Sequence, residues 1–214
     1  MASLLLVSCG EIDPEGDPRA QVGAEPSGRI LFVSEGDVHL WDGSTTKLTE
    51  FGNVGSPAWG PNGEQYLFVR YGDAFSDLYV GNLLSGDFRN LTNNEPPFEP
   101  GTPEYLNQVL WALDPTWSPS GDGIAYASDL GTSKNLLWYK PGVDAQATRV
   151  SCSAINDDNV ETPDFSPDGS QVVFAQREAS TTELERWTEL RICDLSTGEL
   201  TELVTGNEAA FYPT

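Results

Sequence analysis

The chain has 214 residues, of which 38% are hydrophobic and 10% aromatic, so it can bury a sizeable core and general disorder is excluded. Acidic residues outnumber basic ones by 33 to 11, and the net charge of −22 would repel nucleic acid from most of the surface. Glycine (21) and proline (15) are abundant without a triplet period, which predicts frequent turns between short strands.

The N-terminal segment "MASLLLVSCG" ends in a motif that resembles the lipobox of bacterial lipoproteins, and on that resemblance Cys9 is the lipidation site. The basic region and the full apolar core of a secretory signal are incomplete. Either the natural start lies upstream of residue 1 or the likeness is accidental. We favour the first interpretation, because residues 10–27 are acidic and rich in proline and glycine, as expected of a tether.

No other segment approaches the length of a membrane span. We therefore expect the chain to contact a membrane only through a lipid on Cys9.

Three segments repeat one pattern: "SPAWGPNGEQYLFVR" (56–70), "DPTWSPSGDGIAYAS" (114–128) and "TPDFSPDGSQVVFAQ" (162–176). Each contains a proline, an aromatic residue two positions later, a turn that ends in glycine, and an apolar run. Proline presets φ for a type I turn, and glycine accepts the positive φ that leads into the next strand. The motif residues are Pro57, Trp59, Gly63, Pro115, Trp117, Gly121, Pro163, Phe165, Pro167, Asp168 and Gly169.

Each copy predicts two antiparallel strands, and two further strands follow the first and third copies at 77–82 and 88–93, and at 189–195 and 200–205. Four strands per repeat define a propeller blade. Strands are also predicted at 29–34, 37–42 and 46–51, so the first unit lacks its opening strand. Residues 209–214 look like the beginning of another unit.

On these motifs the region 28–214 resembles the WD40-like propeller repeats of the TolB type, which also form the propellers of prolyl-oligopeptidase-like enzymes. Pro61, Pro119 and the pairs Leu48-Thr49 and Leu91-Thr92 contribute to the resemblance. It implies an all-β propeller with units 28–52, 53–95, 112–153 and 160–206, and the start of another at 207–214. We favour an incomplete larger propeller over a closed four-bladed ring.

In a propeller, the connections from the fourth strand of one blade to the first strand of the next share a face. Here they are long and variable, at 94–113 and 153–161, which predicts a binding face. Carboxylates and rings there could hold a cation, a basic peptide or a sugar, and the alternative is a solvated acidic face. The candidate residues are Glu95, Phe98, Glu99, Glu104, Tyr105, Asp157, Asp158 and Glu161, beside Trp111.

Two cysteines, Cys152 and Cys193, remain as an even pair if Cys9 takes a lipid. A disulfide is allowed in an oxidising compartment, and two separate buried thiols are equally open. No CxxC or Cys/His cluster predicts a metal site. We expect Trp59, Trp117 and Phe165 in the core, because they occupy one position in every unit, and His39 on the surface.

The sequence contains no G-x-S-x-G elbow, P-loop or H-E-x-x-H motif, so we expect no catalysis and no cofactor. We favour a non-catalytic scaffold that binds a protein or glycan in the bacterial cell envelope, lipid-anchored, periplasmic or extracellular, as the TolB resemblance implies. Two alternatives stay open: the propeller portion of a prolyl-oligopeptidase-type serine hydrolase whose catalytic domain is absent, and a purely structural sensor or stalk domain.

Overall fold

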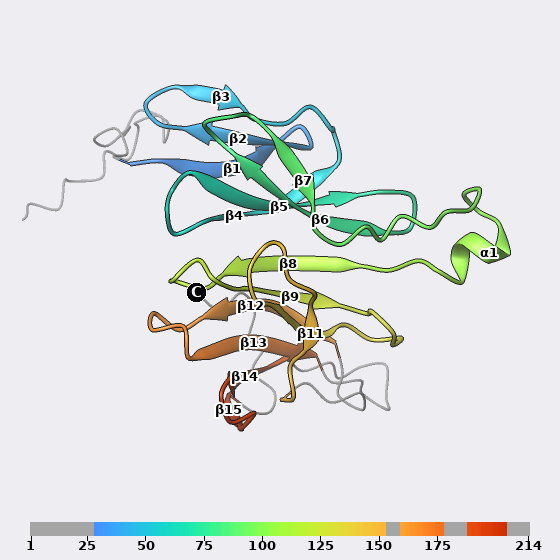
Figure 1. Ribbon diagram of the computed structural model, residues 1–214, viewed down its shortest axis with the longest axis vertical. Coiled ribbons are helices and arrows are strands. Elements are labelled where there is room, and N and C mark those ends of the chain that lie inside the picture. The colour runs from blue at the N-terminus through green and yellow to red at the C-terminus, as the bar shows by residue number, and fades with distance from the viewer. Residues whose placement is uncertain (1–27, 153–158, 178–187, 205–214) are drawn as a thin grey trace, which may run out of the picture.

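The computed structural model describes residues 28–152, 159–177 and 188–204. These ranges form fifteen strands and one short helix, arranged as one three-stranded and three four-stranded antiparallel sheets. Figure 1 shows the four sheets stacked face to face. In every sheet the strands follow one another in chain order, so each sheet is a simple meander. The all-β architecture predicted from the repeats is confirmed.

The sheets are numbered as blades 1 to 4 along the chain. Blade 1 contains three strands within the described residues: β1 (Ile30–Ser34), β2 (Asp37–Trp41) and β3 (Thr45–Lys47). Blade 2 contains β4 (Val54–Trp59), β5 (Gln65–Tyr71), β6 (Ser76–Asn82) and β7 (Phe88–Asn90). Blade 3 contains β8 (Ala112–Trp117), β9 (Ile124–Ser128), β10 (Leu136–Lys140) and β11 (Thr148–Arg149). Blade 4 contains β12 (Val160–Phe165), β13 (Gln171–Arg177), β14 (Thr188–Asp194) and β15 (Leu200–Val204).

The opening strands of successive blades contact each other, since β8 contacts both β4 and β12. Each carries a bulge at the residue before its motif proline, where Ser56, Asp114 and Thr162 have φ of 47°, 48° and 45°. Ser56 Oγ donates to Asp114 Oδ1 at 3.2 Å, and the Thr162 amide donates to Asp114 Oδ2 at 3.3 Å. The bulges therefore tie the opening strands together, and the blades radiate from them.

The proline-glycine turns lie at one end of the blades and contact each other. In the third copy the Gly169 amide donates to Ser166 O at 2.8 Å, and Gly169 has a φ of 74°, as the turn chemistry predicts. A β-carbon added at Gly121 would lie 3.0 Å from Cγ of Pro61 in the preceding blade. Glycine therefore serves both the turn and the close approach of two blades.

Apolar side chains fill the three interfaces between successive blades. The side chains that meet there include Val38 and Phe68 between blades 1 and 2, Leu67 and Ile124 between blades 2 and 3, and Leu137 and Phe174 between blades 3 and 4. Each sheet therefore buries both faces only when it has a neighbour on each side, which is the packing logic of a repeat array.

The three motif rings differ in burial. Trp117 is 8% exposed and belongs to the core between blades 2 and 3, whereas Trp59 and Phe165 are half-buried. The Arg29 guanidinium covers the Trp59 ring, with Cζ 4.9 Å from the ring centroid. His39 is partly exposed, and its ring stacks on that of Phe32 on the paired strand, with centroids 5.4 Å apart.

A buried aspartate closes each of the first two blades. Asp37, at the start of β2, accepts hydrogen bonds at Oδ1 from Thr49 Oγ1 at 2.8 Å and from the Phe51 amide at 2.7 Å. Asp77, at the start of β6, accepts from Thr92 Oγ1 at 2.7 Å and from the Asn94 amide at 2.6 Å. These contacts explain the repeated Leu-Thr pairs, since each threonine fastens the outer strand to the third strand.

Cys152 and Cys193 form a disulfide between blades 3 and 4, with Cα atoms 5.8 Å apart. Both residues lie in the core between these blades, which the two half-buried residues Tyr139 and Leu195 also contact. The sequence left open a disulfide or two separate buried thiols, and the structure contains the disulfide.

Candidate functional site

The connection between β7 and β8, residues 91–111, is here named the arm. It extends away from the sheets and carries the short helix α1 (Pro103–Leu106) near its outer end (Figure 1). Pro103 stands in the first turn of this helix, and Thr102 caps it by accepting a hydrogen bond from the Tyr105 amide at 3.3 Å. The all-β expectation did not include this helix, whose single turn depends on that local cap.

The root of the arm is clamped by Ser76. Its amide donates to Leu110 O at 3.1 Å, and its hydroxyl donates to Ala112 O at 2.8 Å. The Asn94 side-chain amide donates to Ser76 O at 2.8 Å on the other limb of the arm. One buried serine therefore holds both limbs, so the arm leaves the blade at a defined place.

The predicted ring Tyr105 anchors the arm instead of facing a ligand, which corrects its assignment to the binding face. It is 2% exposed, and its hydroxyl donates to the backbone carbonyl of Asp73. Burial raises the pKa of Tyr105, and the charges of Asp73 and Glu95 raise it further. A neutral phenol is the form that donates this hydrogen bond.

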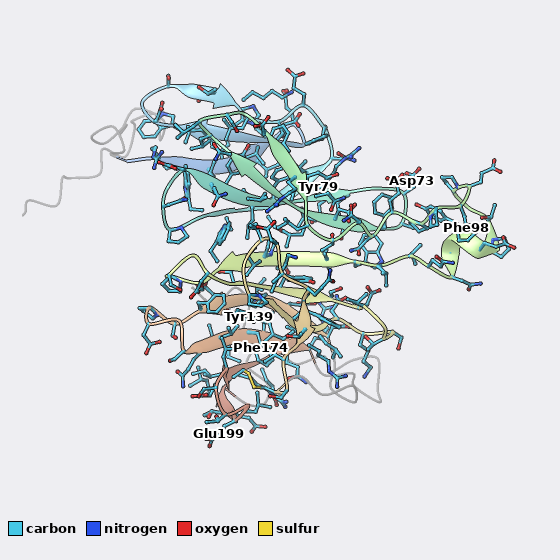
Figure 2. All side chains as sticks on the ribbon, viewed as in Figure 1. Asp73, Tyr79, Phe98, Tyr139, Phe174 and Glu199 are labelled. Atoms are coloured by element: carbon cyan, nitrogen blue, oxygen red, sulfur yellow. A yellow bond between two sulfur atoms is a disulfide. The ribbon has the colours of Figure 1, made fainter. Side chains whose placement is uncertain are left out.

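The outer surface of the arm combines apolar and acidic side chains. Phe98 is 41% exposed and Leu106 is 53% exposed, and Figure 2 shows Phe98 on the projecting part of the molecule. Three predicted carboxylates are exposed on the same segment: Glu95, Glu99 and Glu104. The outer surface of the arm therefore brings together four of the five predicted site residues that the arm carries, the fifth being the buried Tyr105.

The other predicted site residues lie elsewhere. Glu161 is part of β12, where it is half-buried and forms an ion pair with Arg177, so its place on the loop face is corrected: the strand begins earlier than the sequence predicts. Trp111 is half-buried at the root of the arm, and its backbone amide donates to Asp129 at 2.7 Å. Asp157, Asp158 and Cys9 lie outside the described residues.

Sequence reasoning missed two features of this region. Leu106 contributes to the exposed apolar surface, and its position directly after the buried Tyr105 on a one-turn helix is the pattern that could have predicted its exposure. The aspartate partners of the Leu-Thr pairs were also missed. In the sequence, each is an aspartate at or next to the first residue of a strand, with the threonine of its Leu-Thr pair 12 residues after Asp37 and 15 residues after Asp77.

Within the described ranges, no group of three or more histidine, cysteine, aspartate or glutamate side chains is placed to hold a metal ion. In the same ranges no helix has the length and apolar character needed to cross a membrane.

Meander sheets of four strands, stacked face to face with the opening strands of successive blades in contact, define a β-propeller. The chain matches no family model and no curated protein. Among solved structures it is similar to TolB from Acinetobacter baumannii, with a TM-score of 0.62, 19% identity, and coverage of 85% of this chain and 42% of that one.

A putative TolB from Agrobacterium tumefaciens gives a TM-score of 0.60 and 20% identity, over 78% of this chain and 55% of that one. The dipeptidyl peptidase 4 of Porphyromonas gingivalis gives a TM-score of 0.53 and 11% identity, over 86% of this chain and 32% of that one. The chain has the fold of a TolB-like β-propeller, arranged as an incomplete propeller, and it spans about half the length of the TolB structures or less.

Proposed function

We propose that the chain is a non-catalytic interaction scaffold of the bacterial cell envelope, and that the arm is where a partner protein docks. The observation that carries this proposal is the exposure of Phe98 and Leu106 beside three carboxylates on a projecting, clamped segment. Exposed apolar side chains rimmed by polar groups are typical of protein-binding sites.

The chemistry of the arm favours a partner segment that is basic and partly apolar. Carboxylates on a chain with a net charge of −22 would attract lysine and arginine side chains and raise the rate of encounter. Phe98 would then fill an apolar pocket of the partner, where most of the binding energy is concentrated. A glycan is the alternative partner, and a ligand without basic groups would identify it.

Two further features support an envelope location. The TolB-like fold agrees with it, and the disulfide between Cys152 and Cys193 suits an oxidising compartment. A lipid on Cys9 would provide the anchor. Metabolic labelling with palmitate should mark the chain in the envelope fraction, and replacement of Cys9 by serine should abolish the label.

A hydrolase domain encoded in the same gene would contradict the non-catalytic part of the proposal. The propeller of dipeptidyl peptidase 4 shares the fold, but a likeness at 11% identity carries no activity to this chain. If a nucleophile elbow were encoded downstream of Thr214, the chain would be the propeller portion of a peptidase and the scaffold proposal would be wrong.

Docking can be tested by the size of the complex that the tagged chain forms in solubilised envelopes. The double variant Phe98→Ser with Leu106→Ser should lose the high-mass complex on a native gel. Leu84→Ser is the matched control, because Leu84 is 79% exposed on the β6–β7 turn, away from the arm. Retention of the complex by the double variant would remove the arm as the docking element.

A further inference from the structure

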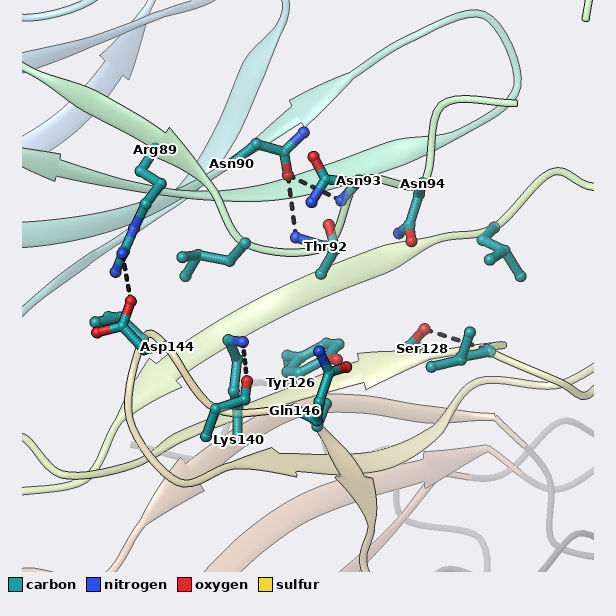
Figure 3. Close-up of a pocket in the computed structure, with 16 residues that line it drawn as sticks. Arg89, Asn90, Thr92, Asn93, Asn94, Tyr126, Ser128, Lys140, Asp144 and Gln146 are labelled. Atoms are coloured by element: carbon teal, nitrogen blue, oxygen red, sulfur yellow. Dashed lines mark hydrogen bonds and ion pairs between the residues drawn. The ribbon is translucent and has the colours of Figure 1, made fainter. Parts of the chain in front are cut away.

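A polar pocket of about 400 Å³ lies between blades 2 and 3 (Figure 3). One wall comes from β7 and the root of the arm, including Asn93 and Asn94. The other comes from β9 and the β10–β11 loop, including Tyr126, Lys140 and Gln146. Its volume is in the range of small-molecule sites, which is about 300 to 1,000 Å³.

The corresponding place between blades 1 and 2 is filled by aromatic rings. Phe68 stands nine residues after Trp59, as Tyr126 does after Trp117 and Phe174 after Phe165. Phe68 packs on Phe51, with centroids 6.0 Å apart, and on Phe88, with centroids 5.8 Å apart. Three aromatic rings therefore pack together at that place.

The pocket exists because these ring positions change in the next interface. Asn94 takes the place of Phe51, since the backbone N–H of each residue donates a hydrogen bond to the buried aspartate of its own blade. Strand register puts Ala147 at the position of Phe88, because Thr148 pairs with Tyr139 as Arg89 pairs with Val80. Asn94, Ala147 and Tyr126 all line the pocket. A ring cluster is thereby replaced by a cavity with polar walls.

Tyr126 adds a hydroxyl to this cavity that the fold does not need. Phe68 and Phe174 occupy the equivalent positions with 0% exposure, so a phenyl ring is sufficient for packing. Tyr126 is 2% exposed, and its hydroxyl has no hydrogen-bond partner within the described part of the chain. Burial raises its pKa to about 12, so the hydroxyl stays protonated and can donate.

Lys140 places an ammonium group on the same wall. It pairs with Ile124, two residues from Tyr126, so the three side chains share one face of the sheet. Lys140 is 6% exposed, and its Nζ donates to Ala145 O, the one acceptor that the described residues provide for its three protons. Burial lowers the pKa of Lys140, as does the neighbouring charge of Arg89, whereas the charge of Asp144 raises it. A bound anion would add to the effect of Asp144.

The equivalent positions of blades 2 and 4 carry Gly81 and Cys193, which pair with Tyr66 and Val172 as Lys140 pairs with Ile124. The ammonium, like the hydroxyl, is therefore particular to blade 3. Two donors that no other described blade has are thus directed to one cavity, which the repeat pattern alone does not explain.

We propose that the pocket between blades 2 and 3 binds a small carboxylate that also carries hydroxyl groups, such as a sugar acid. The Lys140 ammonium would hold the carboxylate, and the Tyr126 hydroxyl with the Asn93 and Gln146 amides would bond the hydroxyl groups.

The charge of the walls sets the charge of the ligand. Arg89 and Lys140 stand against Asp144, so the lining carries one net positive charge on an otherwise strongly acidic chain. Arg89 and Asp144, both part of the lining, neutralise each other in an ion pair of 2.5 Å that joins the two blades. One remaining ammonium matches a monoanionic carboxylate better than a doubly charged phosphate.

Titration calorimetry of the 214-residue chain with D-glucuronate tests the proposal, with D-glucose and glucose 6-phosphate as comparison ligands. Glucuronate should bind at millimolar concentration or below, and glucose should bind at least about tenfold more weakly because it lacks the carboxylate. Equal binding of glucose, tighter binding of glucose 6-phosphate, or no binding of glucuronate would overturn it.

Matched variants place the binding in the pocket. Lys140→Met should weaken glucuronate binding by about tenfold or more, and Tyr126→Phe by about threefold to tenfold. Tyr66→Phe removes a hydroxyl from another buried tyrosine, and Arg149→Gln removes a positive charge from the same blade outside the pocket; both should bind like the parent. Equal affinity in all four variants would contradict the site.

The arm variant Phe98→Ser with Leu106→Ser should bind glucuronate normally, since neither side chain lines the pocket. Failure of the pocket and failure of the docking proposal are therefore distinguishable. Unchanged circular dichroism and unfolding midpoints would show that Tyr126→Phe and Lys140→Met fold.

Discussion

Asp37 shows how a single side chain closes a blade. Its carboxylate is 2% exposed, accepts from the Thr49 hydroxyl and two backbone amides, and pairs with the Lys47 ammonium at 2.9 Å. Burial alone would raise the pKa of Asp37. The hydrogen bonds from Gly52, Lys47, Thr49 and Phe51 outweigh burial and hold this pKa below its ordinary value.

Asp37→Asn should lower the free energy of unfolding at neutral pH by about 2 kcal/mol, because the amide cannot accept the same charge-assisted hydrogen bonds. A carboxylate with a depressed folded pKa contributes stability that is present above its unfolded pKa, near 3.8, and is lost as pH falls. The difference between the parent and the variant should therefore shrink below about pH 4.

Urea unfolding of both proteins between pH 7 and pH 2 measures this difference. Asp168 and Asp194, whose pKa values their serine and threonine partners hold at about 2, are present in both proteins, so their titration cancels. A difference that does not vary with pH would show that the charge of Asp37 is unimportant to the blade.

At the scale of elements, the turns at one end of the propeller form a continuous contact from blade to blade. Gly121 has a φ of 77°, and an added β-carbon would meet Pro61. Gly86 has a φ of 72°, but an added β-carbon there would meet no atom within 4 Å. The two glycines share a backbone conformation, but only Gly121 lies against an atom of the neighbouring blade.

Gly121→Ala should therefore destabilise the chain by about 2 to 3 kcal/mol, since it combines backbone strain with overpacking. Gly86→Ala should cost about 1 kcal/mol from the backbone alone. Thermal unfolding followed by circular dichroism compares them. Equal losses would mean that the turns do not support each other across blades.

The disulfide joins the end of blade 3 to β14 of blade 4 over a separation of 41 residues. Replacing Cys152 and Cys193 together by alanine should lower the free energy of unfolding by about 3 to 4 kcal/mol, because the open chain gains conformational freedom when unfolded. The parent in reductant should approach the double variant in urea unfolding, while Cys9→Ala should be neutral. An unchanged midpoint in reductant would contradict this.

The elements were predictable because their patterns are local. Proline, ring and glycine recur with one spacing around Trp59, Trp117 and Phe165, and turn chemistry then defines the flanking strands. Tyr105 was assigned wrongly, because a ring in an acidic loop gives no information about the direction of its side chain. The pocket was not predictable, since it depends on Asn94 and Tyr126 meeting across an interface between blades.

At the scale of the whole molecule, the features that the blades share hold the fold together, and the features particular to one blade form the two proposed binding sites. The bulges, turns and interior rings repeat, whereas the arm is specific to the junction of blades 2 and 3 within the described chain, as are Tyr126 and Lys140. Both candidate sites meet at that junction, because Asn93, Asn94 and Leu110 at the root of the arm also line the pocket.

The most direct test of this account is site-specific photo-crosslinking in intact envelopes. A photoreactive amino acid placed at Phe98 should give one discrete adduct with a partner protein. The same group at Leu84, which is more exposed but lies on the β6–β7 turn, should give none. Exchange of Glu95, Glu99 and Glu104 for glutamine should weaken the adduct. No adduct at Phe98, or the same adduct from both positions, would contradict docking through the arm.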